Sequence, residues 1–455
     1  MTSPATRLKR TVGIRTASQK QREVSSFSFW LYMYFLVDFF LHMPARVPGY
    51  AYLRPTLLLV LIIGFSLFIQ RQKFSGWTKE PIVKALFAFL IYAALALPLV
   101  EYPGSVLRAN LSEFVKAIIF LFFTALIIDS ERRLVVFLYV FVGCQVFRVL
   151  EPLYLHIVHG YWGQRNYIGD GEFAMRLSGA PSDVVNPNGL GFILVTAIPF
   201  LHYLLWPSGI KGRILYLILM PCLLYALILT SSRGAFLALL VVAFMIWKAS
   251  SRKVLLLALG LLVGMAGWSI MEPQQKDRYL SIVGMSQTSN AASAEGRLRG
   301  MLNEFQVGMN RPVVGHGIGT TGEAKYNLGY GRQAAHNLYA QLLIETGVIG
   351  FVLFLRFLVK IYKQFRRNQI ELKNNRDRVD LEFYRKLNNA MIAVFWMYIV
   401  YSTNYYGVSQ YYWYLFGGVA IVYARLLSKR LDIKSETEST SLLRRRTHGL
   451  VSKVG

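Results

Sequence analysis

Long apolar runs without charged residues, repeated along the chain, constrain its fold more than any other feature. Clear examples are the runs 55–70, 188–210, 214–232 and 254–271. Each is close to the roughly 20 residues that a helix needs to cross about 30 Å of hydrocarbon. A helix satisfies its own backbone hydrogen bonds in lipid, and these runs show no alternating polar face. We therefore predict an all-α integral membrane protein.

About twelve segments are predicted to span the membrane. The run 387–424 is too long for one crossing and has polar residues at 402–404 and Gly407 near its middle, so it is interpreted as a helical hairpin. The predicted spans are 27–43, 53–70, 82–100, 112–128, 134–156, 188–206, 212–230, 234–248, 253–271, 337–358, 387–403 and 409–427.

The basic residues predict the orientation. The net charge is +26, and basic residues cluster in the N-terminal tail, between residues 360 and 386, and from Arg425 to Lys453. Cytoplasmic segments of membrane proteins carry such an excess. Both termini are therefore predicted to be cytoplasmic. Because the charge is placed as this rule requires, it argues against a nucleic-acid partner.

This orientation divides the chain into five parts. Residues 1–26 and 428–455 form cytoplasmic basic tails, which are polar and predicted to be mobile. Residues 27–271 hold the first nine spans and residues 337–427 hold the last three. Residues 272–336 form a large external loop, and long loops of this kind are often functional.

The external loop contains one amphipathic pattern. From Leu298 the apolar residues Met301, Leu302, Phe305 and Met309 recur at helical spacing, and Arg311-Pro312 ends the pattern. One apolar face of this kind predicts a helix lying in the membrane interface.

The external face collects positive charge against the usual bias. The residues predicted there include Arg176, Arg233, Arg297, Arg299, Arg311 and Arg332. Arginine binds phosphate through paired hydrogen bonds, so converging arginines would suit a lipid-linked phosphate or diphosphate. Each one alone could equally be a solvated or headgroup-binding residue. Arg233 differs because it lies in a very short turn between two apolar helices, where a charge is costly without a role.

Two histidines are also predicted outside. His336 begins an apolar run, where a neutral imidazole could accept a proton from a sugar hydroxyl or could simply cap the helix. His316 lies in a glycine-rich bend and is interpreted as structural or adjacent to substrate. The turn Asn186-Pro187-Asn188-Gly189 predicts the start of a helix, capped by asparagine. Amide bonds from this turn to sugar hydroxyls would be an additional role.

Several classes of chemistry have no motif in the chain. There is no P-loop, no dinucleotide fingerprint, no metal-ligand spacing and no HExxH. We therefore predict neither a metal nor another cofactor. Asp170, Glu172 and Asp183 lack the arrangement of a glycosidase or metal site. Asp38 and Glu151 lie in or beside apolar runs, where they could mark an ion path or be internally paired.

Several short motifs occur in order between about residues 176 and 355. They are Arg176-Leu177-Ser178-Gly179, Asn186-Pro187-Asn188-Gly189, Ser232-Arg233-Gly234, Gly296-Arg297, Arg311-Pro312-Val313-Val314-Gly315-His316-Gly317, and His336-Asn337 followed after nine residues by Gly347-Val348-Ile349-Gly350. Their order and spacing resemble the O-antigen ligase and O-antigen polymerase superfamily. Two departures from the family's pattern are the absence of a common tryptophan, where Met301 or Leu302 stands, and His316 in place of a small or apolar residue.

The resemblance implies a fold and a reaction. Members are metal-independent, inverting glycosyltransferases of a GT-C-like kind, with a large periplasmic loop that contains interfacial helices. Their donors are undecaprenyl-diphosphate-linked glycans, used at the periplasmic face of the bacterial inner membrane among the membrane lipids. Inversion needs a base at the acceptor and charge stabilisation at the departing diphosphate.

The resemblance also implies roles for particular residues. Arg233 and Arg297 would bind the donor diphosphate, and His336 would be the catalytic base that activates the acceptor hydroxyl. Gly347 and Gly350 would allow close helix packing below the site. The expected supporting or substrate-binding residues are Arg176, Asn188, Arg299, His316 and Asn337.

Alternatives remain within and outside this family. A ligase would pass the glycan to lipid A-core, which is the preferred reading; a polymerase would pass it to another lipid-linked glycan. A periplasmic protein O-glycosylation enzyme would use the same site. A transporter of bicarbonate or of a lipid-linked sugar is the competing class. Its polar groups should lie near the bilayer midplane, where this chain has little charge apart from Asp38.

Overall fold

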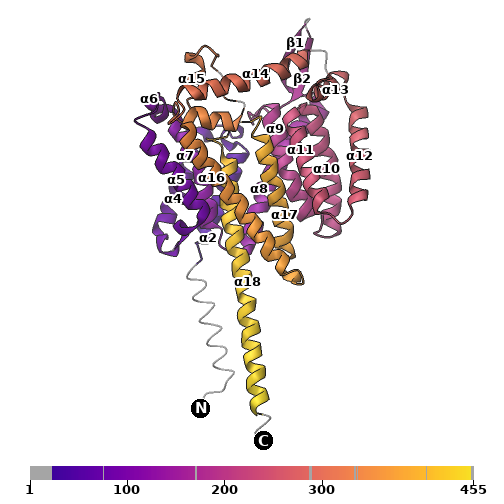
Figure 1. The fold of residues 1–455 in the computed structure, drawn as a ribbon. Helices are drawn as coiled ribbons and strands as arrows, with labels where there is room; N and C mark the ends of the chain where they lie inside the picture. The colour runs from indigo at the N-terminus through magenta and orange to yellow at the C-terminus, as the bar shows by residue number, and fades with distance from the viewer. Residues whose placement is uncertain are drawn as a thin grey trace.

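The computed structural model describes residues 23–74, 76–169, 172–285, 289–332, 335, 337–405 and 407–451. Within these, the side chains of 166–169, 172, 174, 289–295, 297, 298 and 433–451 are outside the description. The described chain is almost entirely helical and contains one two-stranded antiparallel sheet. Its helices stand side by side in a bundle, with the β-hairpin, α13, α14 and α15 gathered at one end (Figure 1).

Short 3-10 turns and two π-helical segments, Val106–Asn110 and Leu201–Leu205, connect or extend the longer elements. Among the 3-10 turns, η6 (Ser281–Val283) belongs to the candidate site. The longer elements are α2 (Ser26–Phe40), α3 (Met43–Arg46), α4 (Pro55–Ile69), α5 (Pro81–Ala96), α6 (Pro103–Ser105), α7 (Leu111–Ile127), α8 (Glu131–His159), β1 (Gly163–Gly169), β2 (Glu172–Leu177), α9 (Pro187–Phe200), α10 (Ile210–Thr230), α11 (Arg233–Ala249), α12 (Lys253–Ile270), α13 (Pro273–Leu280), α14 (Ser289–Asn310), α15 (Thr321–Asn327), α16 (Leu338–Asn374), α17 (Glu382–Tyr401) and α18 (Tyr411–Val451).

The predicted all-α membrane fold is confirmed, and each predicted span coincides with one of these helices. Among the described residues, seven helices are long and apolar enough to cross a membrane. Two further helices, α2 and α5, are apolar but shorter. The chain is therefore a multi-pass membrane protein, and the count of twelve spans stays a prediction.

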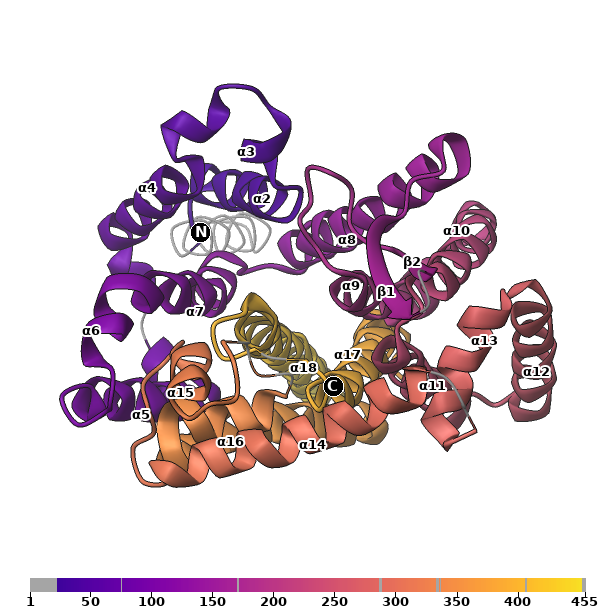
Figure 2. The same cartoon turned by 90° about the horizontal axis from the view of Figure 1, so that it is seen from above.

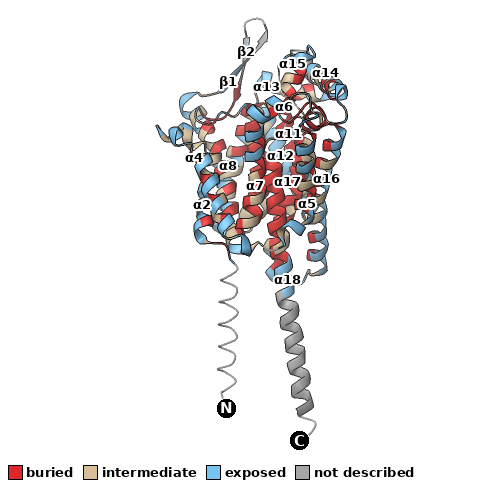
Figure 3. Ribbon diagram, turned by 90° about the vertical axis from the view of Figure 1, so that its left-hand side faces the viewer, coloured by how far each residue is buried: buried red, intermediate tan, exposed pale blue. Residues whose placement is uncertain are grey.

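Burial separates inner from outer helices. Buried residues gather in the interior of the bundle, and exposed residues cover its outer faces (Figure 3). In the helical stretch Pro187–Leu205, which joins α9 and the π-helical segment after it, 72% of the most apolar part is buried, whereas in α12 none of it is. Water would not tolerate an apolar helix such as α12 exposed on all sides, so its surroundings must be lipid or another apolar surface.

The structure contains regular elements that the sequence did not predict in four places. Helix α16 continues past the predicted end at residue 358 to Asn374, and α18 continues past residue 427 into the tail predicted to be mobile. Apolar periodicity reports where a helix meets lipid or core, so it does not detect polar extensions. The hairpin β1–β2 was not predicted. The described part of residues 272–336, predicted to form an external loop, holds three helices, α13, α14 and α15, where the pattern predicted one.

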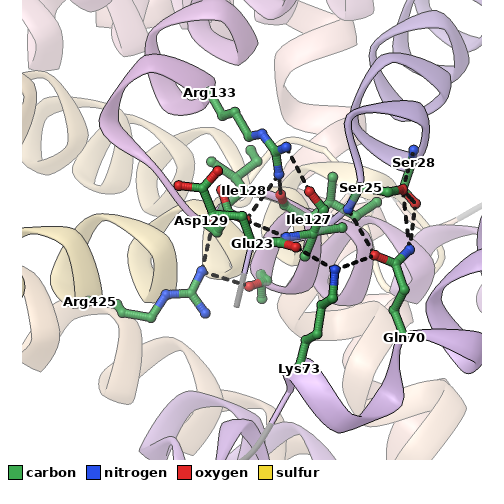
Figure 4. Close-up of polar contacts among 12 residues, drawn as sticks. Glu23, Ser25, Ser28, Gln70, Lys73, Ile127, Ile128, Asp129, Arg133 and Arg425 are labelled. Carbon is green, nitrogen blue, oxygen red and sulfur yellow. Dashed lines mark hydrogen bonds and ion pairs between the residues drawn. The ribbon is translucent and has the colours of Figure 1, made fainter. Parts of the chain in front are cut away.

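Polar contacts close the end of the bundle where α2 begins (Figure 4). The Val24 amide donates to Asp129 Oδ2 at 2.8 Å, and Arg133 Nη2 donates to the Val24 carbonyl at 2.7 Å. From α18, Arg425 Nη2 donates to the Ile128 carbonyl at 2.6 Å. These bonds satisfy carbonyls at the C-terminal end of α7 and hold the starts of α2 and α8 beside it.

A buried ion pair fastens the segment before α9 to α8 near the opposite end. Arg148 donates through Nε to Asp183 Oδ2 at 2.6 Å and through Nη2 to Oδ1 at 2.9 Å. His42 Nδ1 lies 3.1 Å from the same carboxylate. Burial raises the pKa of Asp183, but the interactions with His42 and Arg148 outweigh it and lower the pKa to about 2. Asp183 therefore has a structural role.

Reporter fusions test the number of spans. A reporter active only in the cytoplasm should work after Ser208, Ser251 and Arg376 and should fail after Gly160 and Met285, because the basic loops stay inside. A missing or additional span would invert the result at every fusion point beyond it.

Replacing Asp183 with asparagine should destabilise the protein by about 3–5 kcal/mol, because Arg148 would keep a buried charge without its partner. Thermal unfolding in detergent measures this effect. The matched control Glu113→Gln breaks the exposed pair with Lys116 and should cost at most about 1 kcal/mol. Because the folded pKa is depressed from 3.8 to about 2, the wild-type contribution is complete above about pH 4 and is lost as the pH falls through about 2. Equal losses in the two variants would contradict this role.

Candidate active site

A short turn between α10 and α11 forms the centre of the candidate site. Helix α10 ends at Thr230, and Ser231 adopts a left-handed conformation with φ of 47°. Ser232 then caps α11, its Oγ accepting a hydrogen bond from the Ala235 amide at 3.4 Å. Arg233 is the first residue of α11 and is only 7% exposed. The tight turn predicted at this position is confirmed.

Arg176 reaches this turn from β2. Its Nε donates to the Thr230 carbonyl at 2.9 Å, and its Nη2 donates to Asn188 Oδ1 at 2.9 Å. The same Asn188 oxygen accepts a bond from Ser232 Oγ at 3.0 Å. Arg176 is 4% exposed, so these contacts hold a buried guanidinium in a defined direction.

The start of α9 places Asn188 at this position. Asn186 caps the helix, its Oδ1 accepting from the Gly189 amide at 2.8 Å, which confirms the predicted helix start. Further along α9, a Cβ added at Gly191 would lie 2.5 Å from Ala235 Cβ. The absence of a side chain at Gly191 therefore lets α9 and α11 approach closely and brings Asn188 to Ser232.

Sequence reasoning did not identify the contribution of α13 and η6. Arg278 Nε donates to the Ser231 carbonyl at 2.7 Å, and Arg233 Nη1 donates to Ser281 Oγ at 2.7 Å. Burial raises the pKa of Tyr279 to about 12, although the charges of Arg176 and Arg278 oppose that rise. Three arginines, Arg176, Arg233 and Arg278, therefore surround the turn and are called here the arginine cluster. Arg278 belongs to no periodic pattern of apolar residues and to no motif. Its role depends on the packing of α13 against the turn between α10 and α11, which the sequence does not reveal.

The segment 402–404, directly after α17, contacts both this cluster and the start of α16. The Leu338 amide donates to the Ser402 carbonyl at 2.9 Å. Two residues further on, Asn404 Nδ2 would lie 2.4 Å from a Cβ added at Gly234. One short segment thus supports both Leu338, which follows His336 by two residues, and the residue next to Arg233.

Asn337 caps α16. Its Oδ1 accepts bonds from the amides of Tyr339 at 2.8 Å and Ala340 at 3.3 Å, which is a sufficient structural role. His336 lies outside the described residues, as does the side chain of Arg297, whose backbone belongs to α14. The roles expected for His336 and Arg297 therefore stay predictions.

Helix α14 confirms the predicted amphipathic pattern. Leu302, Phe305 and Met309 are exposed on one face, while Glu304 and Val307 are buried on the other. The helix starts earlier than predicted and ends at Asn310, just before Arg311-Pro312. It crosses the end of the bundle from α15 and α16 towards α11 and α13 (Figure 2). Its place at a membrane interface stays a prediction, and Arg299 lies on it, exposed.

The glycine-rich segment after α14 docks onto a break in α16. The Val348 amide donates to the Pro312 carbonyl at 2.7 Å, and the His316 amide donates to the Ile344 carbonyl at 2.8 Å. Gly347 has φ of 62° and ψ of −172° within α16, and a Cβ there would lie 2.3 Å from the Val313 oxygen. The expected role of Gly347 in helix packing is therefore corrected, because this glycine admits a loop.

Gly350, unlike Gly347, has the expected role of allowing two helices to pack closely. A Cβ added there would lie 2.9 Å from Tyr92 Cε1 on α5, so its absence permits close approach of α5 and α16.

His316 has structural contacts on both ring nitrogens. Its Nδ1 is hydrogen-bonded to Glu101 Oε2, and its Nε2 lies 3.0 Å from the Val307 carbonyl. Burial raises the pKa of Glu101, but hydrogen bonds from Tyr102 and His316, with the charges of His316 and Arg311, bring it below its ordinary value. His316 is 2% exposed, so its ring holds the loop to the segment before α6.

The remaining acidic candidates are internally bonded. Thr56 Oγ1 donates to the buried Asp38 at 3.1 Å, and Glu151 forms an ion pair with Arg46 at 2.5 Å. In the described parts of the chain, no three His, Cys, Asp or Glu side chains are grouped as metal ligands.

Comparison with known proteins adds one finding. Residues 217–355 match a protein-family model described as O-Antigen ligase. The matched segment includes the Thr230–Arg233 turn, α13, α14, the docked loop and the first half of α16. No curated protein matches the chain.

Substituting alanine for Gly347 should destabilise the protein by about 1–3 kcal/mol from backbone strain alone, because this backbone region is almost exclusive to glycine. The close Val313 carbonyl adds to that cost. Thermal unfolding in detergent measures the change. Gly64→Ala is the matched control, since its Cβ would meet open space within α4. A Gly347→Ala protein as stable as the control would contradict the docking role.

Proposed function

We propose that the chain is a periplasmic glycan ligase, because residues 217–355 match a protein-family model described as O-Antigen ligase. The donor is a glycan linked to undecaprenyl diphosphate, and the acceptor is lipid A-core at the outer face of the bacterial inner membrane. One observation carries the proposal: Arg176, Arg233 and Arg278 converge on the turn between α10 and α11.

The arginine cluster suits a diphosphate leaving group. Guanidinium groups form paired hydrogen bonds to phosphate oxygens and keep their charge in poorly hydrated places. Arg176 is held by Thr230 and Asn188, and Arg233 by Ser281, so their directions are set before substrate arrives. Donors fixed in this way stabilise charge that develops as the bond to the diphosphate breaks. Arg297, on α14, is proposed as a further diphosphate ligand.

The proposed reaction inverts the anomeric carbon in one displacement. His336 takes the proton of the acceptor hydroxyl while the hydroxyl oxygen forms the new bond to that carbon. The opposite bond breaks, and its electron pair leaves with the diphosphate. The base and the arginines must therefore face opposite sides of the sugar. The contacts of the segment 402–404 with Leu338 and Gly234 bring the start of α16 and the start of α11 to the same segment, which supports such an arrangement.

Other acceptors remain compatible with the same donor chemistry. A polymerase would use another lipid-linked glycan, and a protein O-glycosylation enzyme would use a protein hydroxyl. A transporter receives less support. Its essential polar groups should line the midplane, whereas Asp38 is bonded to Thr56 and the arginine cluster lies at helix ends.

Loss of either proposed catalytic group should abolish glycan transfer without preventing membrane insertion. His336→Ala should lower the rate about 10²–10⁴-fold, the usual value of a positioned base. Arg233→Ala should lower it about 10²–10³-fold through lost charge stabilisation. Each variant is expressed in a deletion strain and assayed on a lipopolysaccharide gel. His159→Ala and Arg54→Ala change exposed residues that are not members of the arginine cluster, and they should restore the wild-type pattern.

The deletion strain separates the candidate functions. Loss of all banding on core supports a ligase, whereas a single repeat on core supports a polymerase. An unchanged ladder with altered ion uptake supports a transporter. If His336→Ala and Arg233→Ala insert normally and keep full transfer, the proposed site is wrong.

A further inference from the structure

A second polar feature lies at the same end of the bundle as α14 and α15. It is a cavity of about 490 Å³ between the π-helical turn before α7 and the start of α15. Arg108 and Asn110 line it from the π-helical turn, and Gly319, Glu323 and Arg332 line it from the loop region. This volume is in the range of small-molecule sites and exceeds what one phosphate group needs. The cavity therefore has room for a sugar.

Glycines allow the two walls to approach. Gly319 has φ of 77°, and a Cβ there would lie 2.5 Å from Asn110 Cβ. Gly317 has φ of 118°, and its Cβ would lie 2.6 Å from Val106 Cγ2. The segment 315–322 thus lies directly against the π-helical turn. Such π-helical segments are frequent at functional sites.

Hydrogen bonds and an ion pair fix these walls. The Tyr102 amide donates to the His316 carbonyl at 3.0 Å, and Asn327 Nδ2 donates to Tyr102 Oη at 2.8 Å. Behind the wall, Lys325 and Glu304 form a buried ion pair at 3.0 Å that ties α15 to α14. The cavity is therefore preorganised.

The charge of the cavity favours an anion. Two arginines and one glutamate line it, which leaves an excess of one positive charge. Arg108 and Arg332 are exposed to solvent, and within the described chain neither is engaged in an ion pair or hydrogen bond. Guanidinium groups available in this way can bind phosphate or carboxylate.

The position of the cavity relates it to the acceptor side of the reaction. Helix α14 contacts η6 and β1 near the arginine cluster and contacts α15 at the cavity (Figure 2). Its 22 residues span about 33 Å at 1.5 Å per residue. Arg332 precedes His336 by four residues, and Thr321 Oγ1 donates to Glu345 Oε1 of α16 at 2.7 Å. The cavity thus belongs to the α16 side of the site, where the proposed base is supplied.

We propose that this cavity binds a phosphate or carboxylate group on the glycan acceptor, with Arg108 and Arg332 as its ligands. The inference rests on the proposed transferase function and adds a separate acceptor subsite to it. The donor diphosphate is bound by the arginine cluster at the other end of α14. The acceptor lipid, anchored in the membrane, brings its anionic sugars to the cavity and its attacking hydroxyl to the base.

The test measures transfer kinetics with the full-length protein, undecaprenyl-diphosphate-linked glycan and purified lipid A-core. Arg108→Gln and Arg332→Gln should each raise KM for lipid A-core roughly tenfold, as expected for loss of a charged hydrogen bond, with KM for the donor unchanged. If the bound group is a phosphate, phosphatase-treated lipid A-core should show the raised KM with the wild-type protein, and the variants should add little to it. If the bound group is a carboxylate, the treated acceptor keeps its KM with the wild-type protein and shows the raised KM only with the variants.

Two further variants serve as comparisons. Ala109→Trp keeps both charges but fills the cavity, and it should also raise KM for lipid A-core. Arg54→Gln removes an exposed arginine that does not line the cavity, and it should leave both KM values unchanged.

The possible outcomes show whether the proposed subsite fails alone or together with the proposed function. An unchanged acceptor KM in the Arg108→Gln/Arg332→Gln double variant, with transfer intact, overturns the subsite alone. A raised donor KM overturns it too. If the double variant binds phosphatidylglycerol vesicles more weakly than the wild-type protein and its acceptor KM is unchanged, the ligand is a lipid headgroup and the acceptor subsite is overturned. No transfer to lipid A-core by the wild-type protein would overturn the proposed ligase and the subsite together.

Discussion

The backbone of a chain in hydrocarbon must form its hydrogen bonds internally, and the architecture of this protein depends on that constraint. Within lipid, helices meet it, so irregular backbone collects at the helix ends. The Thr230–Arg233 turn, the β1–β2 hairpin and the segment 311–317 all lie at such ends. The polar side chains of the candidate site are therefore concentrated where backbone geometry is free to vary.

The contacts that hold this region together also orient its charged groups. Asn188 receives hydrogen bonds from Arg176 and Ser232, and Ser281 receives one from Arg233. A buried guanidinium is costly unless its hydrogen bonds are satisfied. The neutral partners reduce that cost and leave the side chains preorganised. Fold stability and the proposed substrate binding thus draw on the same residues, whereas the ion pair of Arg148 and Asp183 lies outside the arginine cluster.

Two helices connect the parts of the proposed site. Helix α17 supports the starts of α11 and α16 from within the bundle, and α14 lies across its end (Figure 2). The proposed donor and acceptor subsites are separated along α14. Helix α14 therefore has a geometric role: it links two regions of the bundle that the other helices hold apart.

The sequence by itself determined the membrane class, the position of each predicted transmembrane helix and the cap at Asn186, because hydrophobic length and capping chemistry are local properties. It also marked Arg176, Arg233 and Asn188 as candidates. Only the tertiary structure decided that Arg278 reaches Ser231, that Gly347 admits a loop, and that Arg108 shares a cavity with Arg332. Those relations join residues distant in the chain. They arise from packing between elements, which no local pattern of residues encodes.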